Sequence, residues 1–145
     1  MVEKMKINYT EITPITILLF VWQFPQCLIG LILYFVFRIE PIEYTNQHTN
    51  MTVLWIPTKW SAYWSLGPFI FADYDVGERI LRHETGHSVQ SLYLGPLFLL
   101  AVGLPSVFLF WRRRFWHKSH EWYYEHYPEN WANKLGGVAD IDNKE

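Results

Sequence analysis

Two histidines and a glutamate lie within one short stretch, His83-Glu84-Thr85-Gly86-His87. Residues four positions apart share one face of an α-helix, so the imidazoles of His83 and His87 can reach a single ion. Zinc accepts neutral histidine nitrogens and, in catalytic sites, keeps a fourth position for water. Glu84 would take the proton from that water as general base. The stretch therefore predicts a zinc site with hydrolytic chemistry.

A third zinc ligand can be sought in the C-terminal part of the chain, where Glu129 precedes Asn133 by four positions. The pairing of HExxH with this later motif resembles the thermolysin-like gluzincins, which carry ExxxD on a second helix. The ExxAD form of the membrane-embedded CAAX-prenyl and HtpX-type proteases is similar, with Ala132 at the small position. The resemblance covers these two motifs and implies Glu129 as the third ligand. Asn133 stands where those families have aspartate, which implies a hydrogen bond to a ligand histidine without added charge.

The pattern HExGHxxQSxxLGPL and a tail close to WADxLGG also resemble small bacterial membrane proteins, a likeness that implies no substrate. Other third ligands stay open among the acidic and histidine residues of the tail. We prefer Glu129, because its spacing to Asn133 has a mechanical reason. We expect the first two histidines of the tail at a membrane interface and its first two glutamates on a solvated helix face. The alternatives are Glu121, Glu125, His117, His120 and His126.

Two stretches, 12–37 and 88–111, contain no Asp, Glu, Lys or Arg. A helix needs about 20 apolar residues to cross a bilayer, so both qualify by length. The alternative is two buried core helices, which so short a chain has too little polar surface to cover. The sequence therefore predicts a transmembrane helix over 12–37, kinked at Pro25, with Gln23 and Gln26 facing protein rather than lipid.

The second stretch poses a geometric problem for the zinc site. A straight crossing by 88–111 would separate its ends by about 36 Å and leave Glu129 on the side opposite His83. Zn–N and Zn–O bonds are near 2 Å, so the three ligand atoms must lie within about 5 Å of one another. Gly95-Pro96 offers a reversal, since glycine ends helices and proline begins them. We therefore expect a membrane-dipping hairpin, with an antiparallel return limb kinked at Pro105.

Composition limits the remaining classes of function. The net charge of −2 lacks the basic footprint of a nucleic-acid-binding protein, and the single cysteine, Cys27, excludes an internal disulfide. Half of the residues are hydrophobic, and the aromatic share of 19% is far above that of an ordinary soluble domain. The runs MTVLWIP and SLGPFIFAD predict two short strands. The second strand either packs against the histidine helix or forms an edge with which an extended substrate can pair.

Together these features predict one α+β membrane-embedded domain over 1–145. It comprises a transmembrane helix (12–37), short strands (51–73), the HExxH and return helices (76–111) and a third-ligand helix (119–137). The expected function is a zinc-dependent membrane hydrolase, most simply a metallopeptidase that acts on a peptide or membrane-protein substrate. We place it in the inner (cytoplasmic) membrane, with the active site at the cytoplasmic face and Arg112 to Arg114 as anchor.

Two other classes stay open: a non-catalytic metal-binding or partner-binding membrane protein, and a hydrolase of a lipid-modified substrate. The presence of Glu84 favours catalysis, because a purely structural metal site has no use for a base at that position.

Overall fold

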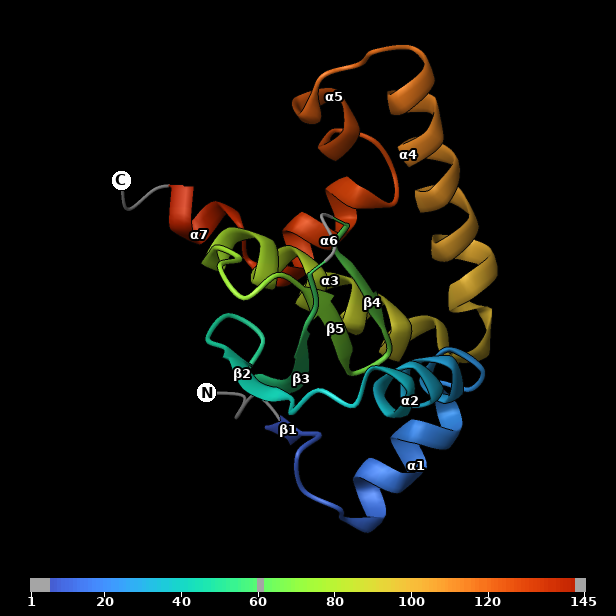
Figure 1. Ribbon diagram of the computed structural model, residues 1–145, viewed down its shortest axis with the longest axis vertical. Helices are drawn as coiled ribbons and strands as arrows, with labels where there is room; N and C mark the ends of the chain where they lie inside the picture. The colour runs from blue at the N-terminus through green and yellow to red at the C-terminus, as the bar shows by residue number, and fades with distance from the viewer. Residues whose placement is uncertain (1–5, 60–61, 143–145) are drawn as a thin grey trace.

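The computed structural model describes residues 6–59 and 62–142. Figure 1 shows a small sheet at the centre, two N-terminal helices at one end and a long helical limb along one side. Short C-terminal helices lie beside the central helix α3 and the upper part of the limb. The predicted α+β class is confirmed.

The sheet is mixed and runs in the order β1-β3-β5-β4, with β2 paired to β3. Because β2 and β5 both pair with Leu54 and Trp55, they lie on opposite sides of β3. The β1–β3 and β3–β5 pairs are parallel, and the other two pairs are antiparallel. The strands are β1 (Ile7–Asn8), β2 (Ile42–Asn46), β3 (Met51–Pro57), β4 (Trp64–Leu66) and β5 (Phe69–Ala72).

Both faces of the two central strands are buried, because successive side chains of a strand point to opposite faces. One face joins Val53 and Ile70 to Leu81 of helix α3 (Glu78–Leu94). The opposite face packs on the second N-terminal helix and is formed by Ile56, Leu66, Phe69 and Phe71. Helix α3, which carries the two histidines, is thereby fixed against the sheet.

The strand predictions hold in part. MTVLWIP forms β3 as expected, but SLGPFIFAD contains the turn between β4 and β5, where Gly67 has a φ of +61°. Glycine adopts that conformation without the steric cost of a side chain. β2 lies in a polar stretch of the sequence that carries no strand signal. Its side chains are mostly exposed, so the alternation that marks a strand with one buried face is missing from the sequence.

The region predicted to form one transmembrane helix is two helices, α1 (Pro14–Trp22) and α2 (Gln26–Phe37), set at 106° to each other. Among the described residues no single helix has both the length and the apolar character to cross a membrane, although this bent pair passes the same test jointly. Pro25 stands at the break. Polar contacts hold the elbow, because Gln23 donates to the Tyr9 hydroxyl and the Trp22 indole to Leu92 O. Gln23 and Gln26 are buried against protein, as expected.

Helix α3 ends at Leu94, as predicted, and Gly95 has a φ of +52°. The return limb comprises η1 (Gly95–Leu97), a π-helical stretch η2 (Leu99–Gly103) and α4 (Leu104–Phe115). Pro105 has no N–H to give to Ala101 O, and the Tyr127 hydroxyl donates to that carbonyl instead. The irregular turn therefore lies where the sequence predicts a kink.

The sequence predicts a return limb that lies antiparallel beside α3, and this prediction is wrong. Figure 1 shows the limb rising away from the α3 corner, while the later helices bring the chain back over α3. The single helix predicted over 119–137 is divided into α5 (His120–Tyr124) and α6 (Glu129–Gly136), followed by α7 (Ala139–Asp142). Residues of the limb and of α3 line opposite sides of one cavity.

Candidate metal centre

Helices α3 and α6 cross at backbone contact distance. A Cβ atom on Gly86 would lie 1.9 Å from Ala132 O, and one on Gly136 would lie 1.9 Å from Arg82 O. Only glycine permits this approach. The small residues of both motifs, including the fully buried Ala132, therefore bring Glu129 against the two histidines.

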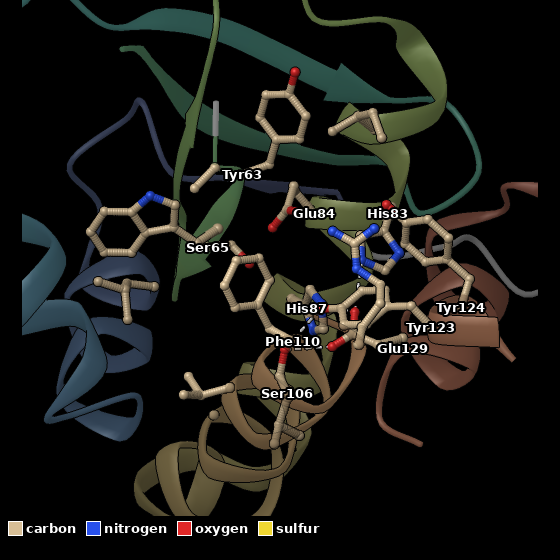
Figure 2. A pocket seen from close by; sticks show the side chains of 18 of the residues that line it. Tyr63, Ser65, His83, Glu84, His87, Ser106, Phe110, Tyr123, Tyr124 and Glu129 are labelled. Carbon is tan, nitrogen blue, oxygen red and sulfur yellow. Dashed lines mark hydrogen bonds and ion pairs between the residues drawn. The ribbon is translucent and has the colours of Figure 1, made fainter. Parts of the chain in front are cut away.

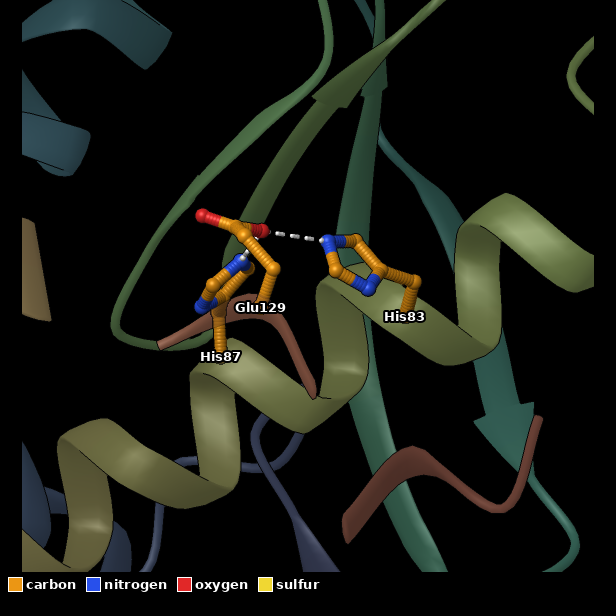
Figure 3. A group of neighbouring side chains, drawn as sticks. All are labelled: His83, His87 and Glu129. Carbon is orange, nitrogen blue, oxygen red and sulfur yellow. Dashed lines mark hydrogen bonds and ion pairs between the residues drawn. The ribbon is translucent and has the colours of Figure 1, made fainter. Parts of the chain in front are cut away.

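The three predicted ligands converge on one point (Figure 3). Glu129 Oε2 lies 3.0 Å from His83 Nε2 and 3.1 Å from His87 Nε2. One ligand atom from each residue falls within 4.8 Å of the others, and all three side chains are buried. This meets the geometric requirement that the sequence sets for the site. The donor set of two imidazoles and one carboxylate is one that zinc accepts.

Nδ1 of each imidazole is held by a hydrogen bond, which leaves Nε2 as the possible ligand atom. His83 Nδ1 donates to Asn133 Oδ1 at 2.8 Å, and His87 Nδ1 donates to Gln90 Oε1 at 2.7 Å. Gln90 in turn donates to Pro128 O. With Nδ1 as a donor, each Nε2 faces Glu129, where it donates to the carboxylate when protonated and offers a lone pair to a metal once that proton is lost.

The second carboxylate oxygen of Glu129 is bound by the return limb. Ser106, next to Pro105 on α4, donates its hydroxyl hydrogen bond to Glu129 Oε1. The Tyr123 hydroxyl lies 3.4 Å from Ser106 Oγ. Glu129 therefore turns a single oxygen toward the histidines.

The electrostatics at the convergence point favour positive charge. Burial alone would raise the pKa of Glu129, but hydrogen bonds from His83 and His87 hold it well below its usual range. Burial alone would lower the pKa of His87, and the contact with Glu129 outweighs it and raises that pKa to about 9. A carboxylate held ionised in the protein interior suits a proton or a metal cation between these atoms.

Glu84 faces the cavity beside this group (Figure 2). Its side chain is 3% exposed, and its Oε2 has no hydrogen-bond partner among the described residues. Burial raises the pKa of the Glu84 carboxyl, against the opposing charges of His83 and His87. An unpartnered buried carboxylate oxygen is costly for a fold, and this one lies next to two imidazoles.

The cavity has a volume of about 1000 Å³ and lies between α3, the edge strand β4 and the return limb. Trp64 and Ser65 of β4 line it on one side, and Tyr123 and Tyr124 of α5 on another. The side formed by the limb is mainly apolar, with Phe98, Leu99, Val102, Leu104, Val107 and Phe110. This space can hold an extended chain with apolar substituents.

The alternative third ligands lie outside the convergent group. Glu121 and Glu125 are exposed, as expected for a solvated face, and His117 is exposed next to α4. His120 lines the cavity and accepts a hydrogen bond from Arg113. His126 Nδ1 donates to Trp122 O.

Sequence reasoning missed Gln90, Ser106, Tyr123 and Tyr124. Gln90 could have been found, because it lies three positions after His87 on the same helix face. Ser106 and the tyrosines lack such a signal, because the path of the limb brings them to Glu129 and His83 across the chain.

No match to the chain was found in comparisons with known protein families, curated proteins or solved structures.

Proposed function

We propose that the protein is a zinc-dependent hydrolase, most simply a metallopeptidase, with His83, His87 and Glu129 as the metal ligands. The observation that carries this proposal is the convergence of three ligand atoms within 4.8 Å on helices held at backbone contact. The tautomers of both imidazoles support it, because each Nδ1 is committed to an acceptor and each Nε2 is directed inward. Asn133 and Gln90 orient the two histidines.

Glu84 is the general base of this proposal. A zinc ion held by the three ligands would supply a water molecule with a pKa lowered to about 7. Glu84 follows His83 on the helix, faces the same cavity and keeps Oε2 available to accept a proton. The Tyr123 hydroxyl, whose pKa is raised by burial and by the charge of Glu129, stays neutral and can donate a hydrogen bond.

The edge strand β4 provides a place for the substrate backbone. β4 pairs with β5 on one side and ends the sheet on the other, where Trp64 and Ser65 face the cavity. An extended peptide can add to such an edge through backbone hydrogen bonds. The side chains of that peptide would then meet the apolar side chains of the return limb.

The exposed apolar surface supports a protein that is embedded in a lipid bilayer, the inner (cytoplasmic) membrane. Helices α1, α2 and α4 present large apolar side chains that are more than half exposed, such as Leu18, Phe35 and Phe108. A protein in water exposes such groups only in small patches. Arg112 to Arg114 at the end of α4, flanked by Trp111 and Trp116, suit the cytoplasmic interface. The cavity would open at that face to a peptide or membrane-protein substrate.

Elemental analysis of protein purified under mild conditions tests the metal centre. We expect about one zinc ion per chain, lost in His83→Ala and in His87→Ala. Glu84→Gln should keep the metal and lose hydrolysis of an apolar peptide, because the amide cannot accept the proton. Glu121→Gln, which changes an exposed glutamate of α5, is the matched control and should change neither property.

Two results would contradict the proposal. Wild-type protein that binds no transition metal would remove the ligand assignment, and full hydrolytic activity in Glu84→Gln would remove the general base.

A further inference from the structure

Two arginines line the cavity, Arg79 on α3 and Arg113 on α4. Among the described residues that line it, none is a lysine. Arg79, His83 and His87 follow one another at four-residue spacing, so they form a stripe on one face of α3. The Cα atoms of Arg79 and His83 are therefore separated by a rise of about 6 Å along the helix axis. The cavity thus pairs the candidate metal centre with a nearby positive charge.

Two adjacent tyrosines of α5 hold both guanidinium groups in place. Arg79 lies over the Tyr124 ring at 6.0 Å, and Arg113 lies over the Tyr123 ring at 5.8 Å. The two ring centroids are 5.2 Å apart, and the Tyr124 ring is 4.9 Å from that of His83. Contacts of this kind orient a cation without using its N–H donors. The two positive groups therefore stand on one side of the cavity, next to the candidate metal centre.

Most N–H donors of Arg79 and Arg113 make no hydrogen bond to the described residues. Among the described residues, Arg79 uses Nε toward the exposed Asp142 at 3.3 Å, and Arg113 uses Nη1 toward His120 at 2.9 Å. A guanidinium carries five N–H donors in a geometry that matches a carboxylate. Arg112 and Arg114, by contrast, do not line the cavity. Of the three arginines at 112–114, Arg113 is therefore the one that faces the cavity.

We propose that Arg79 and Arg113 form a carboxylate-binding subsite of the cavity, for an apolar chain that lies along the return limb. This rests on the proposed function only in taking the cavity as the substrate site. The Tyr124 ring contacts both Arg79 and His83, so at about 3.3 Å per residue of extended chain the bound carboxylate lies within a few residues of the bond at the metal centre. The carboxylate can come from a chain terminus or from an acidic side chain.

Three labelled apolar peptides distinguish these sources by fluorescence anisotropy, with Glu84→Gln protein in detergent so that no peptide is cleaved. One peptide has a free C-terminus, the second is its C-terminal amide, and the third is an amide with a glutamate near its end. We expect the free acid or the glutamate peptide to bind about tenfold tighter than the plain amide, because charge-assisted hydrogen bonds form. Whichever peptide binds tighter identifies the source.

Arg79→Gln and Arg113→Gln should each bring the ratio of acid to amide affinity close to one. Arg112→Gln and Arg114→Gln are matched controls that should retain the tenfold ratio. Equal binding of acid and amide, no binding of any peptide, or equal losses in the controls would overturn the subsite. Metal content and hydrolysis are measured separately. Zinc-dependent turnover without a carboxylate preference overturns this inference alone, and a carboxylate preference in protein that binds no metal overturns the proposed function alone.

Discussion

Glu129 is bound at both of its carboxylate oxygens, and the two contacts come from different parts of the chain. The histidines of α3 approach Oε2, while Ser106 of the return limb donates to Oε1. The side chain is fully buried, so its orientation is set by these contacts rather than by solvent. Ser106 therefore acts as a positioning residue, because its contact leaves the other oxygen of Glu129 directed at His83 and His87.

Ser106→Ala should weaken zinc binding about tenfold or more, because partners of ligand side chains typically contribute on that scale. Competition with a chromophoric chelator measures the affinity, and the visible spectrum of the cobalt-substituted protein reports the change in ligand geometry. Ser106→Thr retains the hydroxyl and should restore part of the affinity.

Ser91→Ala is the control for this prediction. It removes a buried hydroxyl that accepts from Gln26, away from Glu129, and should leave zinc affinity unchanged. An unaltered affinity and cobalt spectrum in Ser106→Ala would show that Glu129 needs no support from α4.

At the scale of elements, the crossing of α3 and α6 decides whether Glu129 reaches His83 and His87. Gly86 and Gly136 each meet the backbone of the other helix, so no side-chain rotation could relieve an added methyl group. The glycine inside HETGH is therefore required for this packing, although it lies between the two histidines and does not line the cavity.

Gly86→Ala should destabilise the protein by about 1–3 kcal/mol and lower its zinc content, because the helices must separate. Thermal unfolding in detergent and elemental analysis measure the two effects. Gly103→Ala, in the return limb, is the matched control: its Cβ would make an ordinary 3.5 Å contact with Leu99, so stability should not fall. A Gly86→Ala protein as stable and as metal-rich as the control would contradict this packing account.

At the scale of the whole molecule, the apolar surfaces of the N-terminal helices and of the return limb meet at one corner. Trp22 donates to Leu92 O, and Gln26 donates to Gly95 O, so the elbow of α1 and α2 closes the end of α3. Apolar side chains of both regions are exposed on either side of that corner, among them Phe24 and Leu97. One surface that combines both regions can enter a bilayer as a unit.

Single cysteines at Asp75 and Lys118, in a Cys27→Ser background, test this arrangement in sealed vesicles. Both positions are exposed, whereas Arg82 on α3 is buried and would react poorly. We expect a membrane-impermeant reagent to label both from the same side, because α6 returns the chain to α3. Labelling from opposite sides would contradict the packing of α6 on α3 in the membrane. A monodisperse preparation without detergent would contradict the proposed embedding in a bilayer.

The sequence by itself determined the local chemistry of the site. HETGH requires only helical periodicity to place His83 and His87 on one face with Glu84 beside them. The end of α3 at Leu94 followed from the properties of glycine and proline, and Asn133 lies against His83 as its spacing to Glu129 suggested. These features depend on residues a few positions apart, where backbone geometry leaves few alternatives.

The tertiary structure alone decided the elements whose partners are distant in sequence. The break between α1 and α2, the β2 strand and the path of the return limb depend on contacts with Leu92, β3 and Tyr127, which periodicity cannot report. Ser106 and Arg113 become part of the site for the same reason, since the path of the limb brings them to the cavity. Side-chain types and local spacing predict which groups can react, whereas long-range packing decides which groups surround them.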